Sequence, residues 1–122
     1  MISKGGERVA RKKRYIKGKV YLIDDKVLSL DGYSKKDRRV VALNNNKNKM
    51  HVAKIKSLYD SNGKKRGKLI PIEKYPDIRK PSGVYTYVYR KTKWNTPIKE
   101  RKLVKTNTRL NKWDMKKLTK LK

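Results

Sequence analysis

The chain of 122 residues carries 37 Lys and Arg against 10 Asp and Glu, which gives a formal charge of +27. Its length suits one domain, and such a charge would repel itself strongly without a polyanion nearby. The absence of Cys and the presence of a single His argue against a disulfide framework and against a zinc site. We therefore expect one domain that binds nucleic acid and needs no metal or other cofactor.

Residues 1–17 are predicted to form a flexible basic arm. The pair Gly5-Gly6 interrupts regular structure, and a run of four like charges cannot pack against itself. This run is expected to contact phosphates and consists of Arg11, Lys12, Lys13 and Arg14. The arm lacks the apolar stretch of a secretory signal, and no segment has the apolar length of a membrane span. We expect no membrane partner and a cytoplasmic location, in a bacterium or as the product of a phage or mobile element.

Residues 18–122 are predicted to form a single β-barrel domain with a C-terminal helix. Short apolar runs rich in β-branched residues, separated by turns, predict strands. They are expected at residues 18–23, 27–30, 38–43, 50–57, 69–72, 84–89 and 98–104. The run 50–57 has apolar residues on both faces, which is typical of a central strand, whereas Pro71 restricts its strand to an edge. The pattern predicts a mainly β fold, namely a small antiparallel barrel.

The predicted helix lies at the end of the chain. Asn111 is expected to cap it, with Asp114 three residues later as a variant of the capping box. Its packing face is expected to consist of Leu110, Trp113, Leu118 and Leu121.

Motifs for nucleotide binding and for nucleophilic catalysis are absent, and Asp24-Asp25 is the nearest approach to a metal site. Neighbouring residues of a strand or turn point apart, so we interpret this pair as turn-forming. RNA can be cleaved without a metal when its own 2′-OH attacks phosphorus, a base accepts the proton and a cation stabilises the phosphate. Arg38, next to Arg39 at the start of an apolar strand, is a candidate cation, because a guanidinium binds two phosphate oxygens at once. The alternative is a solvated charge pair beside the strand.

Three tyrosines alternate along the predicted strand 84–89. Tyr85, Tyr87 and Tyr89 share one face, and Arg90 follows directly. Aromatic faces beside cations stack on unpaired bases, but in a chain without Phe the same tyrosines could equally fill a core. Both interpretations stay open. A further contact with nucleic acid is expected from an exposed basic loop, formed by Lys64, Lys65 and Arg66.

Three segments resemble the PemK/MazF family of toxin endoribonucleases. They are Lys17-Gly18-Lys19-Val20-Tyr21 in the first strand, Arg38-Arg39-Val40-Val41-Ala42-Leu43 in the third, and His51-Val52-Ala53-Lys54-Ile55-Lys56-Ser57 in the next. The family pattern begins with Gly-Asp-Ile/Val-Tyr/Trp, continues with Arg-Pro-Val-Val-Val-Ile, and then has an apolar strand that ends in Thr-Ser. Residues 110–115 also resemble the start of the family's last helix.

The resemblance implies an SH3-like barrel, usually a dimer, that cuts single-stranded RNA without a metal by means of an arginine and a threonine. The arginine corresponds to Arg38, and Arg39 stands where the family has proline. Lys56 occupies the threonine position, the nearest hydroxyl is that of Ser57, and Lys19 replaces an acid of the first motif. Either the site is rebuilt around Arg38, Lys56 and Ser57, or cleavage has been lost and a basic RNA-binding barrel remains.

Other classes of protein fit the same composition. A structural component of a ribonucleoprotein would sit on folded RNA through its basic surface, and a phage or mobile-element factor would bind duplex DNA through phosphates. RNA is the favoured partner because of the resemblance. A toxin of this charge would also need an acidic antitoxin, and a second copy of the chain is a further candidate partner.

Overall fold

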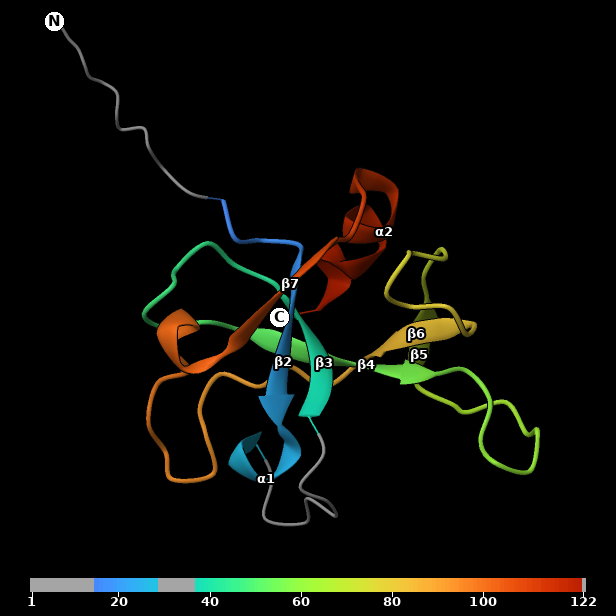
Figure 1. Cartoon of the computed structure of the whole chain (residues 1–122), viewed down its shortest axis with the longest axis horizontal. Coiled ribbons are helices and arrows are strands. Elements are labelled where there is room, and N and C mark those ends of the chain that lie inside the picture. The colour runs from blue at the N-terminus through green and yellow to red at the C-terminus, as the bar shows by residue number, and fades with distance from the viewer. Residues whose placement is uncertain (1–14, 29–36, 122) are drawn as a thin grey trace, which may run out of the picture.

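The computed structural model describes residues 15–28 and 37–121. In this part of the chain six strands form one antiparallel sheet, in the order β5-β6-β4-β3-β2-β7 (Figure 1). The strands are β2 (Lys19–Asp24), β3 (Asp37–Ala42), β4 (Val52–Ser57), β5 (Leu69–Pro71), β6 (Ser82–Tyr85) and β7 (Val104–Arg109). The predicted mainly β fold with a short C-terminal helix is confirmed.

The sheet is not closed into the barrel that the sequence led us to expect. Its two edges are β5 and β7, which have no strand partner in common. β5 has three residues and ends at Pro71, which has no backbone N–H to donate to a further strand. This edge position of Pro71 is the one predicted from the sequence.

The central strand β4 was predicted correctly, since it pairs with β3 on one side and with β6 on the other. The predicted strand 84–89 is shorter than expected, because regular pairing ends at Tyr85. Tyr89 instead forms an isolated bridge with Val52, in which each backbone N–H donates to the other residue's carbonyl at 2.8 and 2.9 Å.

Two predicted strands are wrong. Residues 25–28 of the expected turn and second strand form the short helix α1 (Asp25–Leu28), where the Lys26 N–H donates to Asp24 Oδ1 at 3.0 Å. Residues 29 and 30 of that strand lie outside the described residues. The expected strand 98–104 contains the 3-10 helix η1 (Glu100–Lys102), and the last strand, β7, begins only at Val104. β7 escaped prediction because it is a mostly exposed edge strand rich in polar residues.

The core lies on both faces of the sheet because successive side chains of a strand point to opposite sides. In β3, Val40 and Ala42 belong to a first hydrophobic cluster together with Tyr21 and Ile98, whereas Val41 belongs to a second cluster. The first cluster also receives Ile16, whose side chain is 1% exposed. The described end of the predicted arm is therefore packed on the domain.

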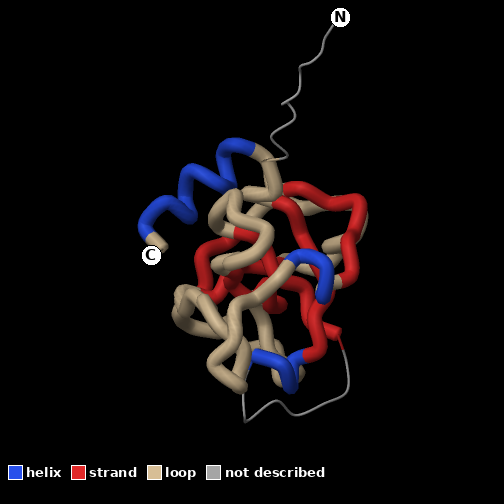
Figure 2. The backbone as a smooth tube through the Cα atoms, turned by 90° about the vertical axis from the view of Figure 1, so that its left-hand side faces the viewer, coloured by secondary structure: helices blue, strands red, loops and turns tan. Residues whose placement is uncertain are grey.

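The C-terminal helix α2 (Lys112–Lys117) and the 3-10 helix η2 (Leu118–Lys120) lie at the end of the sheet away from α1 (Figures 1 and 2). Asn111 is the predicted cap, and its side chain accepts a hydrogen bond from the Asp114 N–H at 2.8 Å. Leu118 is buried in the second cluster, but Trp113 is 59% exposed, so its predicted place on the packing face is wrong. The prediction counted Leu110 as part of the helix, whereas the helix begins at Lys112 and Asp114 takes the buried position.

None of the helices among the described residues has the length and apolar character that crossing a membrane requires.

Candidate nucleic-acid interface

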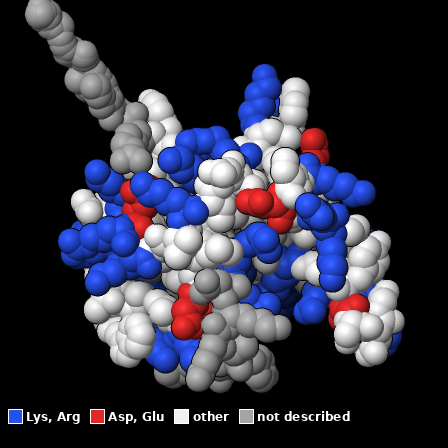
Figure 3. Space-filling model, viewed as in Figure 1, with Lys and Arg blue, Asp and Glu red and all other residues white. Residues whose placement is uncertain are grey.

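The chain has a large excess of positive charge. On the face seen in Figure 3, Lys and Arg side chains spread over most of the described surface, and acidic side chains form a few small groups. This distribution by itself attracts any polyanion without specificity. A candidate site therefore needs residues whose positions are fixed by the fold.

Such residues lie on the sheet, where three cations share one face. Lys54 of β4 stands directly opposite Val40 of β3, and both side chains lie on the side of the first hydrophobic cluster. Arg38 is two residues before Val40 and Lys56 is two residues after Lys54, so both project from the same face. Arg38 in β3 and Lys56 in β4 thus lie on the same face of the sheet as the first hydrophobic cluster, but beyond its buried part.

Asp25 anchors two of these cations. Its Oδ1 lies 2.5 Å from Lys54 Nζ, and its Oδ2 lies 3.8 Å from Arg38 Nε. The Oδ1 contact is an ion pair and not a well-directed hydrogen bond. Both Asp25 and Lys54 are buried, whereas the Arg38 side chain is 46% exposed. The carboxylate holds Lys54 in place and leaves Arg38 accessible to a ligand.

Tyrosine rings lie beside the ammonium groups. Lys56 Nζ is 4.6 Å from the centre of the Tyr85 ring, and Lys54 Nζ is 5.2 Å from the centre of the Tyr89 ring. Tyr87 packs edge-on against Tyr89 with the ring centres 4.6 Å apart, and it is 57% exposed. Part of the tyrosine series thus supports the cations, while Tyr87 presents its ring to solvent.

The cations also act on one another. The pKa of Lys56 is lowered from its ordinary value, first by partial burial and then by the charges of Lys54, Arg66 and Arg38, against which Asp25 acts weakly. Arg66 comes from the loop after β4, and its backbone N–H donates to Leu58 at 2.6 Å. We name this group the cation–tyrosine cluster, and it comprises Arg38, Lys54, Lys56, Arg66, Tyr85, Tyr87 and Tyr89 around Asp25.

The cluster unites six residues that the sequence analysis proposed at separate places in the chain. They are Arg38, Lys56, Arg66, Tyr85, Tyr87 and Tyr89. Lys64 and Lys65 are exposed in the same loop as Arg66. The Lys64 N–H donates to Asp60 Oδ1 at 2.9 Å, and Lys65 bridges Tyr59, so a turn holds this part of the loop.

The remaining candidates lie elsewhere. Ser57 pairs with Ser82 on the opposite face, and its hydroxyl donates to the Tyr59 carbonyl at 3.0 Å, so the structure does not bring it together with Arg38. Arg39 is exposed on that opposite face as well.

Two further candidates are not among the members of the cluster, and four are not described. Lys19 stands opposite Arg109 at the far end of β2. Arg90 is exposed near His51, and its charge adds to the effect of burial in lowering the pKa of His51. The candidates outside the described residues are Arg11, Lys12, Lys13 and Arg14.

Two members of the site were missed from the sequence. Asp25 was assigned to a turn, although only Asp24 plays that role, and Lys54 was not selected at all. A lysine in the middle of an apolar central strand is the signal that could have found this pair, because a buried ammonium group requires a partner. No group of three or more His, Cys, Asp or Glu suited to a metal ion lies within the described ranges.

Comparison of the chain with protein-family models, with curated proteins and with solved structures found no match. The resemblance to the PemK/MazF family therefore stays a prediction that depends on the short sequence motifs.

Proposed function

We propose that this protein binds single-stranded RNA through the cation–tyrosine cluster. The observation that carries the proposal is the clustering of three further cations around Lys56 with a single carboxylate among them, which leaves an excess of positive charge at a position fixed by two strands and a loop. Phosphate groups are the ligands that arginine and lysine bind in this way. The ion pair with Asp25 supports the preorganisation of the site before a ligand arrives.

The tyrosines support a single strand as the ligand. Tyr87 offers an exposed ring next to the cations, and an unpaired base can stack on such a ring, whereas a paired base keeps its faces inside the duplex. The resemblance to an endoribonuclease family favours RNA over DNA.

A second proposal is that the bound RNA is cleaved without a metal. This proposal is supported by Lys56, which neighbours Arg38. The lowered pKa of Lys56 increases the fraction of its amine that is neutral and can accept a proton. Neutral Lys56 would take the proton of a 2′-OH while that oxygen attacks phosphorus. The bond to the 5′-oxygen then breaks, and the proton passes to this leaving group. Arg38 would stabilise the phosphate, and the products are a 2′,3′-cyclic phosphate and a 5′-hydroxyl.

The binding proposal is tested by the salt dependence of affinity for a fluorescent single-stranded RNA. In the double variant Arg38→Gln/Lys56→Gln we expect the slope of log affinity against log salt to fall by about 1.4, since each phosphate contact of a single strand contributes about 0.7. The matched control is Lys116→Gln/Lys120→Gln, which removes the same charge from exposed positions in α2 and η2. Equal losses in the two variants would show that only total charge matters and would contradict the proposal.

The cleavage proposal is tested with a long single-stranded RNA in EDTA. We expect discrete fragments with cyclic-phosphate ends, and we expect none from Arg38→Ala or Lys56→Met. If the RNA stays intact but bound, the cleavage proposal is contradicted, and the result supports an RNA-binding protein of the ribonucleoprotein type. Equal affinity for duplex DNA would instead support the DNA-binding alternative.

A further inference from the structure

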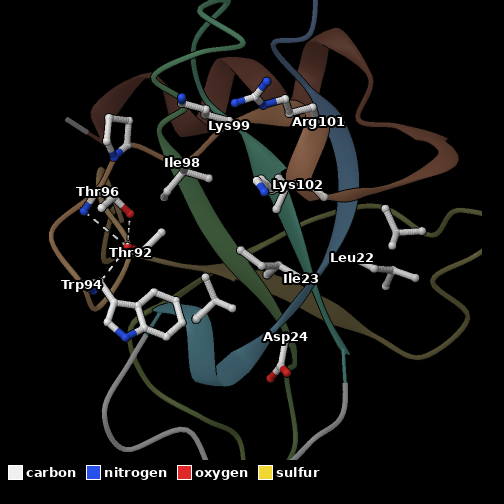
Figure 4. A pocket seen from close by; sticks show the side chains of 14 residues that line it. Leu22, Ile23, Asp24, Thr92, Trp94, Thr96, Ile98, Lys99, Arg101 and Lys102 are labelled. Carbon is white, nitrogen blue, oxygen red and sulfur yellow. Dashed lines mark hydrogen bonds between the residues drawn. The ribbon is translucent and has the colours of Figure 1, made fainter.

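A second feature of the surface lies outside the cation–tyrosine cluster. It is a pocket of about 680 Å³ between β2, α1, the hairpin around Trp94 and η1 (Figure 4). Its apolar lining includes Ile23, Val27, Ile98 and Leu103. A pocket of this size that is mostly apolar, with a few polar groups at its edge, has the character of a ligand site.

Trp94 forms one wall of the pocket and is 62% exposed. The fold sets its position, because the Trp94 N–H donates to Thr92 Oγ1 at 3.2 Å and Asn95 turns the chain with a φ of 64°. The Lys93 N–H also donates to the Val27 carbonyl at 2.8 Å, which fastens the hairpin to α1. An indole ring is therefore held open to solvent beside an apolar cavity, with Lys93 Nζ 4.9 Å from its centre.

The pocket is bordered by three basic residues, Lys99, Arg101 and Lys102, which line one side of it in Figure 4. They are not the residues that pair with Asp25 or Asp114, whose partners in the described part of the chain are Arg38, Lys54 and Lys117. Asp24 is the acidic residue of the lining, and one of its oxygens already accepts the Lys26 N–H. The charge of the rim therefore complements an anionic ligand.

We infer that this pocket holds one unpaired base of the RNA strand, with the base stacked on Trp94 and the adjoining phosphates on the three rim cations. The inference rests on the proposed RNA binding. α1 links the two sites, because Val27 lines the pocket while Asp25 belongs to the cation–tyrosine cluster. Val27 and Tyr89 also pack against the same hydrophobic cluster, which places both sites around one part of the core.

An acidic peptide with an apolar anchor is the competing occupant. An exposed indole that lines a pocket and has a lysine beside it favours a base, because aromatic rings beside cations bind bases of any sequence. The pocket also shares α1 with the cation–tyrosine cluster, whose own cations and tyrosines suit the same strand.

The chain supplies a matched control, since Trp113 is equally exposed and has Lys112 Nζ 5.2 Å from its ring but does not line the pocket. The variant Trp113→Phe therefore reports Trp94 fluorescence, and Trp94→Phe reports Trp113. Each would be titrated with a single-stranded RNA heptamer, with an abasic ribose-phosphate oligomer of the same length, and with a Glu-rich peptide containing Leu.

We expect the RNA to quench Trp94 and not Trp113, and the abasic oligomer to quench neither. Trp94→Ala should weaken RNA binding about tenfold, while Trp113→Ala leaves the affinity unchanged. Equal quenching of Trp94 by the abasic oligomer, or a preference for the peptide, would overturn the inference. If RNA binds in a manner that depends on Arg38 and Lys56 while Trp94 stays silent, only the inference about the pocket fails. If the protein binds no RNA, the proposed function itself fails.

Discussion

Asp25 Oδ1 lies 2.5 Å from Lys54 Nζ, and less than a tenth of either side chain is exposed. The contact joins α1, at the end of β2, to the middle of the central strand β4. The contact therefore contributes both to the stability of the fold and to the positions of Lys54 and Arg38.

Replacing Asp25 by Asn leaves a buried ammonium group without its counter-charge. We expect the free energy of unfolding in urea to fall by about 3 kcal/mol, because breaking one side of a buried ion pair is more costly than removing both partners. The double variant Asp25→Asn/Lys54→Met should recover part of this loss. Asp24→Asn is the control and should cost less than about 1 kcal/mol, because an amide oxygen can still accept the Lys26 N–H. Equal costs for Asp24→Asn and Asp25→Asn would contradict the assignment.

The positions of the apolar strands along the chain were predictable, because the alternation of apolar residues depends only on neighbouring residues. β3 and β4 each contain a short apolar run, Val40 to Ala42 and Val52 to Ala53, which located them to within about two residues. α1 was not predictable in this way, since Val27 and Leu28 suit a strand as well as a helical turn. What decides between them is tertiary, namely the burial of Asp25 against Lys54.

The cation–tyrosine cluster was predictable in its members but not in its assembly. Arg38, Lys56 and Tyr85 could be selected as residue types at strand positions. Their proximity depends on the register of β3 on β4 and of β4 on β6, which depends on turns and packing that the sequence does not display. The opposite orientation of Ser57 was predictable, because neighbouring side chains of a strand point to opposite faces.

Gly83 occupies a position with little room for a side chain. A Cβ there would lie 3.0 Å from the Ile70 carbonyl oxygen, from Leu58 Cδ2 and from Leu69 Cβ. We expect Gly83→Ala to reduce the free energy of unfolding by about 2 kcal/mol, because the crowding displaces β5 from β6. Gly67→Ala, where a Cβ would meet open space, is the matched control and should change stability by less than about 0.5 kcal/mol in the same urea titration. A neutral Gly83→Ala would show that the edge strand moves freely.

Tyr75 connects the loop before β6 to the C-terminal helix. Its hydroxyl donates to Asp114 Oδ2 at 2.5 Å and accepts the Asn111 N–H at 2.9 Å. Tyr75→Phe removes both bonds, and we expect a loss of about 2 kcal/mol in the free energy of unfolding. Trp113→Phe, a change at an exposed ring of the same helix, is the control.

Tyr75 also predicts a pH dependence. Burial, followed by the hydrogen bond to Asp114, raises the pKa of Tyr75 from 10.0 to about 12. The folded state thus favours the protonated phenol, so this contribution to stability is complete below pH 10 and is lost as the pH rises from 10 to about 12. Urea titrations at pH 9.5 and 11.5 should show that part of the decline in the wild-type protein is absent from Tyr75→Phe. If the free energy of unfolding falls equally in the wild type and in Tyr75→Phe, the pH dependence does not come from Tyr75.

Lys56 should react with amine reagents at lower pH than an ordinary lysine, because its lowered pKa increases the neutral fraction. Competitive labelling read by mass spectrometry over a pH series gives the midpoint. Arg66→Gln should move this midpoint upward, because it removes a neighbouring positive charge, whereas Arg79→Gln, an exposed change away from the cluster, should leave it in place. RNA bound at the cluster should also raise the midpoint, since phosphate stabilises the ammonium form. If neither Arg66→Gln nor bound RNA changes the labelling midpoint of Lys56, then Lys56 does not interact with the neighbouring cations or with the proposed ligand.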